Sequence, residues 1–187
     1  YGLQAPAKGG HYESWFVRAN HPHKPQAIWI RYTLFRARDR RPALGEVWAV
    51  WSDGARQCTH AFKEEFPLES CRFSTSQMQV DADDNHLQPG ALQGQLRRDS
   101  EQLSWDLHYD DGESPLLFLP ESFYLRPLPK AKSLVSRPHI RLSGTLTLNG
   151  ETIVLDQWPG SENHNWGSQH TDRYAWGQVV GFDNAPD

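Results

Sequence analysis

Apolar and polar side chains alternate strictly in two stretches of this sequence, residues 102–109 and 140–148. Side chains of a β-strand point alternately to opposite faces, so a period of two predicts strands with one buried and one solvated face. Asn149 and Gly150 separate the second stretch from the apolar residues at 153–155. Asn followed by Gly favours the type I′ turn of a β-hairpin, because both central residues need positive φ. The sequence therefore predicts antiparallel sheet.

Strand-like segments recur along the whole chain of 187 residues, separated by many of its 13 Pro and 14 Gly. Eight Trp, eight Phe and six Tyr also favour strands over helices. Segment 116–136, with Pro at 120, 127 and 129, is expected to be an ordered connection across the outside of the fold. We expect about ten strands, near residues 11–18, 26–36, 45–52, 57–64, 77–82, 91–97, 101–109, 138–148, 151–158 and 172–182.

Each face of such a sheet that lacks polar side chains must be hidden from water. The predicted fold class is therefore all-β, an antiparallel β-barrel or a barrel-like sandwich of about ten strands. Residues 1–187 are expected to form a single domain. Because the chain begins with Tyr1 and ends soon after a strand-like run, we expect it to be part of a longer protein.

Charge and hydropathy exclude several classes of protein. Nineteen Lys and Arg against 23 Asp and Glu give a net charge of −4, so nucleic acid is not an expected partner. No window approaches the roughly 18 apolar residues of a membrane span. Cys58 and Cys71 alone do not make a disulfide framework, and they leave the compartment open, with the cytoplasm slightly favoured.

The densest group of unusual side chains lies within residues 158–178. Strand alternation places His164 and Trp166 on one face and groups Tyr174 with Trp176, and the loop register decides whether these two faces coincide. A histidine beside indole and phenol rings could move protons in an apolar cavity, where the ring faces stabilise a carbocation. The alternative is that these rings only fill the core.

Glu13 and Arg31 stand on neighbouring predicted strands beside Trp15 and Trp29. They either pair inside a barrel, which would require full hydrogen bonding, or lie on the surface. The histidines of residues 158–178 are not spaced like metal ligands, so no metal is expected. Hydrolase, kinase and dehydrogenase patterns are absent from the sequence, and no cofactor is expected.

Several short motifs together resemble one known family. They are residues 10–16 (GHYESWF), 27–33 (AIWIRYT), 129–133 (PKAKS), 163–167 (NHNWG) and 174–178 (YAWGQ). In this order they resemble the lipocalin-like AttH group, which is related to carotenoid 1,2-hydratase (hydroxyneurosporene synthase), tocopherol cyclase and Svf-type proteins. The resemblance spans nearly the whole chain and implies two packed lipocalin-like lobes, of which this chain is the N-terminal one. It also implies an apolar ligand, often a polyene or isoprenoid, held in a cavity.

In the hydratase branch of this group, a His and a Trp of an H-N-W motif, with a Tyr and an Asp further on, form the acid–base and cation-stabilising set. His164 and Trp166 match the first pair, and Tyr174 and Asp183 correspond to the second by position. The resemblance thus implies catalytic roles for His164, Tyr174 and Asp183. Trp176 stands where the hydratases carry an Asp, which argues against hydratase activity itself.

The predicted function is binding of a hydrophobic small molecule in a barrel cavity, with cofactor-free hydration or cyclisation as the reaction that such a site would support. One alternative is a non-catalytic lipid-binding or scaffold protein, in which the same residues hold two lobes together. A carbohydrate-binding β-sandwich is a further alternative, suggested by the abundance of Trp alone. The expected ligand-binding residues are Glu13, Trp15, Trp29, Arg31, Asn163, Trp166 and Trp176.

Overall fold

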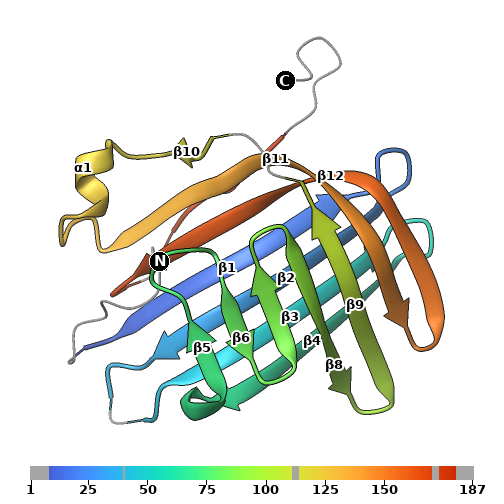
Figure 1. Ribbon diagram of the computed structural model, residues 1–187, viewed down its shortest axis with the longest axis horizontal. Coiled ribbons are helices and arrows are strands. Elements are labelled where there is room, and N and C mark those ends of the chain that lie inside the picture. The colour runs from blue at the N-terminus through green and yellow to red at the C-terminus, as the bar shows by residue number, and fades with distance from the viewer. Residues whose placement is uncertain (1–8, 40, 111–113, 170–172, 180–187) are drawn as a thin grey trace.

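The computed structural model describes residues 9–39, 41–110, 114–169 and 173–179, and the fold is almost entirely β (Figure 1). Between the strands lie a 3-10 turn, η1 (Leu68–Ser70), and one turn of α-helix, α1 (Glu121–Tyr124). The strands are β1 (His11–Asn20), β2 (Gln26–Arg36), β3 (Leu44–Asp53), β4 (Cys58–Pro67), β5 (Cys71–Phe73), β6 (Val80–Ala82), β7 (Asn85–Gln88), β8 (Ala91–Arg98), β9 (Glu101–Tyr109), β10 (Leu116–Leu117), β11 (Ala131–Leu148) and β12 (Glu151–Gly167).

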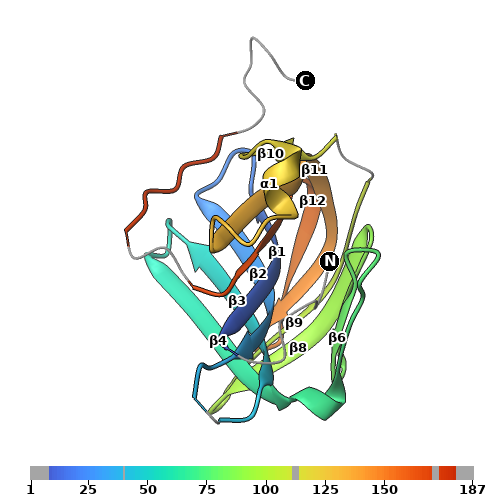
Figure 2. The same cartoon turned by 90° about the vertical axis from the view of Figure 1, so that its left-hand side faces the viewer.

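These strands form one antiparallel sheet that curls into a nearly closed barrel (Figure 2). The strand order is β4-β3-β2-β1-β12-β11-β9-β8-β7-β6-β5, and β10 pairs with β11 outside this path. The long strands β11 and β12 have register shifts near Arg137, Ile140 and Gly144. Such bulges bend a strand and increase its twist, so this hairpin can join the two halves of the barrel.

Side chains connect the edge strand β4 to the β8–β9 hairpin. Arg98 Nη1 donates a hydrogen bond of 2.8 Å to the carbonyl oxygen of Ala61 on β4. His60 Nδ1 on the same strand lies 2.8 Å from Glu101 Oε1 at the start of β9. These contacts close the barrel where the backbone ladder stops.

The barrel interior is a packed hydrophobic core. Trp15, Tyr32, Trp51 and Phe62, from four consecutive strands, are each at most 2% exposed. Aromatic side chains of this size bury about 150–250 Å² each, which makes them a large part of the stabilisation of the fold. The inward positions of β1 and β2 alternate along each strand with outward ones, as β geometry requires.

The predicted fold class is confirmed, and so is the predicted hairpin. Asn149 and Gly150 have φ values of 50° and 86°, as a type I′ turn requires, and they join β11 to β12. Both strands extend beyond the predicted ranges. In β11 this is possible because Pro138 lies inside a register shift, where a missing backbone donor is tolerated. Cys58 and Cys71 are free thiols.

The prediction of a strand near 172–182 is wrong for residues 173–179, the part of this range that the structure describes. Residues 173–179 run across the outside of the sheet without pairing to any strand, so their side chains rather than their backbone make the contacts. The expected connection 116–136 contains β10, α1 and the first six residues of β11. The aromatic alternation at 174–178 therefore reflects packing on a surface rather than a place in the ladder.

Candidate functional site

Two groups of polar side chains lie back to back on strands β1 and β12. Glu13 and Trp15 point into the barrel, whereas Ser14 and Phe16 point to its outside. Trp15 is the register partner of His164, so the imidazole also faces the interior. The same two strands therefore build an inner site and an outer site.

A carboxylate lies between two histidines in the inner site. Glu13 Oε1 lies 2.8 Å from His164 Nε2, and Glu13 Oε2 lies 3.4 Å from His11 Nε2. All three side chains are buried. A carboxylate in this position fixes the orientation and tautomer of the imidazole, the arrangement on which acid–base catalysis by histidine usually depends.

The imidazole of His164 belongs to a column of aromatic rings. It stacks with Trp15 at a centroid distance of 5.4 Å and with Trp166 at 4.4 Å, with interplanar angles of 12° and 18°. Phe73 continues the column beyond Trp15, and Tyr124 of α1 continues it beyond Trp166. The column excludes water from the imidazole and leads toward the barrel end near α1.

Burial lowers the pKa of His164, and the hydrogen bond and charge of Glu13 offset this only in part. Because the ordinary pKa of histidine is about 6.5, the His164 imidazole is mainly neutral at pH 7. A neutral imidazole held by a carboxylate can accept a proton, and the imidazolium that forms can then donate it.

A second inner cluster involves three residues that the sequence analysis did not select. The Tyr109 hydroxyl donates a hydrogen bond of 2.5 Å to Glu162 Oε2, and Arg137 Nε lies 3.8 Å from the same oxygen. Burial and the neighbouring Glu162 carboxylate raise the pKa of Tyr109 well above its usual value. Glu162 precedes His164 by two residues, so strand alternation alone could have placed it on the inner face.

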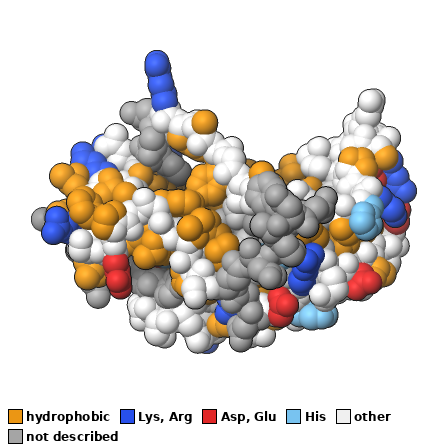
Figure 3. All heavy atoms as spheres, turned by 90° about the horizontal axis from the view of Figure 1, so that it is seen from above, with side chains coloured by type: hydrophobic (Ala, Val, Ile, Leu, Met, Phe, Trp, Pro, Cys, Tyr) orange, Lys and Arg blue, Asp and Glu red, His pale blue; other side chains and the backbone are white. Residues whose placement is uncertain are grey.

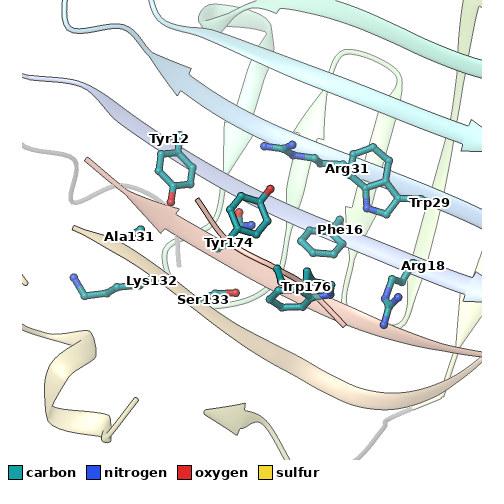
Figure 4. Close-up of a pocket in the computed structure, with 12 residues that line it drawn as sticks. Tyr12, Phe16, Arg18, Trp29, Arg31, Ala131, Lys132, Ser133, Tyr174 and Trp176 are labelled. Atoms are coloured by element: carbon teal, nitrogen blue, oxygen red, sulfur yellow. The ribbon is translucent and has the colours of Figure 1, made fainter. Parts of the chain in front are cut away.

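The outer site is a hollow of about 430 Å³ on the outside of β2, β1, β12 and β11, partly covered by residues 173–179 (Figure 4). We call it the outer hollow. Its aromatic lining comes from β1, β2 and the covering segment, and its polar lining includes two arginines. The lining residues are Tyr12, Phe16, Arg18, Trp29, Arg31, Ala131, Lys132, Ser133, Asn165, Tyr174, Ala175 and Trp176.

Hydroxyl groups of the sheet hold the two arginines of the outer hollow. Arg31 donates to Ser14 Oγ from Nη2 at 2.6 Å and from Nε at 3.1 Å. Arg18 Nε donates to Ser161 Oγ at 3.2 Å. Burial lowers the pKa of both guanidinium groups, although for Arg31 the charge of Glu46 opposes this effect.

The structure separates the residues that the sequence predicts for one site. Those on the inner face are Glu13, Trp15, His164 and Trp166. Those that line the outer hollow are Trp29, Arg31, Tyr174 and Trp176. Asn163 is buried on the outer side, where its Nδ2 donates to Ser161 Oγ at 2.9 Å, and Asp183 lies outside the described residues. Glu13 and Arg31 lie on opposite faces of the sheet, which excludes the ion pair considered from the sequence.

Phe16 and Arg18 are among the residues of the outer hollow that sequence reasoning missed. They share strand parity with Tyr12, so the alternation of β1 was the signal that could have found them. Among the described residues, no cluster of His, Cys, Asp or Glu is arranged to hold a metal ion. The described part of the chain also contains no helix of the length and apolarity that crossing a membrane requires.

The fold places the chain in the class of lipocalin-like β-barrels and is similar to two solved structures. A protein assigned as AttH from Nitrosomonas europaea aligns over 87% of this chain and 53% of its own, with a TM-score of 0.61 and 18% identity. Kievitone hydratase from Nectria haematococca aligns over 88% of this chain and 49% of its own, with a TM-score of 0.52 and 14% identity. These similarities confirm the predicted resemblance to the AttH-type fold.

Comparison by sequence finds uncharacterized proteins from two Mycobacterium tuberculosis strains, CDC 1551 and H37Rv. Each is 23% identical over 174 residues, covering 89% of this chain and 48% of the relative. The chain thus spans about half the length of the curated relatives it matches. No family model matches the chain.

Proposed function

We propose that this chain is a lipocalin-like lobe that binds a hydrophobic small molecule, of the size of an isoprenoid, polyene or polyketide, in the outer hollow. The observation that supports this most directly is the aromatic lining on the outside of a sheet, to which Phe16, Trp29 and Trp176 contribute. Outward faces of antiparallel sheets are ordinarily polar, so such a lining calls for an apolar occupant.

The size of the hollow agrees with this proposal. Its volume of about 430 Å³ lies within the range of about 300–1,000 Å³ typical of small-molecule sites. Trp176 is 47% exposed and packs edge-on against Phe118, with ring centroids 5.7 Å apart. A ligand beneath Trp176 would bury more of this indole, which supplies part of the binding free energy.

Titration with retinol tests the proposal through quenching of tryptophan fluorescence. We expect retinol to bind and maltohexaose not to bind. Phe16→Asp places a charge in the hollow and should weaken retinol binding at least tenfold, about 1.4 kcal/mol. Phe35→Asp is the matched control, because Phe35 lies on an outward position of β2 but does not line the hollow. Binding of maltohexaose without retinol would favour the carbohydrate-binding alternative and reject the proposal.

A second candidate function is cofactor-free hydration or cyclisation at the inner site. It is supported by the stacking of His164 with Trp15 and Trp166 and by its hydrogen bond to Glu13. A polyene incubated with the protein should then change its absorption spectrum, and His164→Ala should abolish this change. Since His164 faces away from the outer hollow, the same variant should leave retinol affinity within tenfold. His108→Ala, an exposed position on β9, is the control.

We also propose that a second lipocalin-like lobe completes the protein. The coverage of only 48% of the tuberculosis relatives supports this arrangement. The top of the barrel carries exposed apolar side chains on and near β10 and α1 that such a lobe would cover (Figure 3). They are Leu116, Leu117, Phe118, Phe123, Leu125 and Leu128.

The full-length protein distinguishes a ligand-binding lobe from a scaffold. If the outer hollow holds a ligand, retinol should bind the full-length protein and the isolated lobe with similar affinity. If the hollow instead packs against the second lobe, retinol should not bind the full-length protein, and Phe16→Asp should lower its unfolding temperature more than Phe35→Asp does.

A further inference from the structure

We propose that the ligand of the outer hollow is an amphiphile with an anionic head, a carboxylate or a phosphate on an apolar chain, and that Arg31 and Arg18 bind the head. This inference rests on the proposed function, since it names the chemical class of the ligand for the same hollow. It depends on the placement of two cations beside an aromatic surface rather than on the resemblance to any other protein.

Arg31 is positioned by hydrogen bonds that leave its charge uncompensated. Nε and Nη2 both donate to Ser14 Oγ, a neutral acceptor on a fully buried serine. The guanidinium carbon lies 6.0 Å from the centroid of the Trp29 ring, at the margin of a cation–π contact. The guanidinium is thus oriented, and it retains donors for an oxyanion.

Glu46 is the acidic residue whose charge acts on Arg31, but its carboxylate already has other partners. Glu46 Oε1 lies 2.8 Å from Lys63 Nζ, and Glu46 Oε2 accepts a hydrogen bond from Trp48 Nε1 at 3.2 Å. In the part of the chain that the structure describes, no carboxylate lies within ion-pairing distance of Arg31 or Arg18. Buried charges in proteins are normally paired, so two partly buried cations without a counter-charge favour an anion from outside the lobe.

The second cation lies across the apolar surface from the first. Arg18 on β1 donates to Ser161 Oγ, and Figure 4 shows Phe16 and Trp29 between the two arginines. Asn165, which also lines the hollow, has a buried Oδ1 that receives no hydrogen bond from the described residues. The hollow therefore offers donors for an anion, an acceptor for a hydroxyl and aromatic rings for a hydrocarbon chain.

Guanidinium groups suit this role because their planar array of donors matches carboxylate and phosphate oxygens. In the partly desolvated hollow, water competes less with an anion for the guanidinium groups, so their attraction to the anion is stronger. An uncharged ligand of the same shape would gain the apolar contacts but leave both cations unpaired. The affinity difference between an acid and its alcohol analogue therefore measures the proposed interaction.

Retinoic acid and retinol are the probes, because they share a polyene chain and differ at the head group. Quenching of tryptophan fluorescence should give an affinity for retinoic acid at least tenfold higher than that for retinol, and added salt should reduce the difference. Arg31→Met should weaken retinoic acid binding at least tenfold and change retinol binding less than threefold. Arg31→Lys should retain part of the preference, since it keeps the charge but not the planar donors.

Two further variants keep the test decisive. Arg97→Met removes an exposed arginine of β8, away from the hollow, and should change neither affinity. Arg18→Met replaces Arg31→Met if circular dichroism shows that the latter does not fold. Displacement of retinoic acid by palmitic acid would identify a carboxylate head, and displacement by farnesyl diphosphate a phosphate head.

The outcomes separate this inference from the proposed function. Equal affinities for retinoic acid and retinol that Arg31→Met leaves equal would overturn the anionic head while retaining an apolar ligand. Failure of both retinoids to bind would reject the proposed function itself.

Discussion

Glu13 Oε1 lies 2.8 Å from His164 Nε2, although 151 positions separate the two residues in the chain. Pairing of β1 with β12 brings them together, since Glu13 lies opposite Trp166 and Trp15 lies opposite His164 in the ladder. The contact is buried, so the carboxylate acts on the imidazole with little screening by water.

Replacing Glu13 should change the titration of His164. Glu13 raises the pKa of the imidazole through its hydrogen bond and its charge, against the stronger effect of burial. Glu13→Gln removes the charge, so the pKa of His164 should fall further below its usual value. Titration of the imidazole Cε1–H signal by NMR measures this shift, with Glu64→Gln, at an exposed residue of β4, as the control. A pKa that rises in Glu13→Gln would contradict the assigned role of the carboxylate.

Stability should decrease as the pH falls below about 6.5. The folded-state pKa of His164 is lower than its unfolded value, so between these two pKa values the unfolded chain binds more protons. The contribution of His164 is fully present above pH 6.5 and is lost as the pH falls toward the folded pKa. The slope should approach about 1.4 kcal/mol per pH unit within that window.

Urea unfolding at several pH values between 5 and 8 measures this dependence. The His164→Gln variant should show a flatter profile than the unmodified protein, whereas His108→Gln should not, because His108 is exposed. An equally steep profile in His164→Gln would assign the pH dependence to other groups.

Tyr109 should contribute to stability through its hydrogen bond to Glu162. Tyr109→Phe removes the hydroxyl that donates a hydrogen bond to the buried Glu162 carboxylate. The loss should lower the free energy of unfolding by about 1–3 kcal/mol. Tyr174→Phe provides a comparison, since Tyr174 is 75% exposed and the loss should be within about 0.5 kcal/mol. Chemical denaturation of both variants checks the difference, and equal losses would show that the hydrogen bond contributes nothing.

Gly144 should be required for the close approach of β11 to the backbone of β9. Its φ is +126°, and a Cβ atom at this position would lie 2.2 Å from the carbonyl oxygen of Asp106. Gly144→Ala should therefore cost about 1–3 kcal/mol in the free energy of unfolding. Gly177→Ala is the control, because nothing lies within 4 Å of its Cβ position. A thermal unfolding midpoint equal to that of the unmodified protein would show that the ladder adapts at no cost.

Local pattern was a good guide to the strands and a poor one to the assembled sites. The hairpin at Asn149 and the alternation along 102–109 depend on neighbouring residues, so the sequence predicts both. The separation of His164 from Tyr174 does not, because residues 168–172 could connect the two segments in more than one register. The Tyr109–Glu162 contact also escaped prediction, since it joins β9 to β12 across 53 positions.

The sequence by itself determined that this protein is an antiparallel β structure and which side chains of each strand share a face, because strand alternation is a local property. Only the tertiary structure decided which face became the interior, where the barrel nearly closes, and that Trp176 covers the outside while Trp166 stacks within. These outcomes depend on strand register and on contacts between distant segments, whose free energy is a sum over the whole fold rather than over adjacent residues.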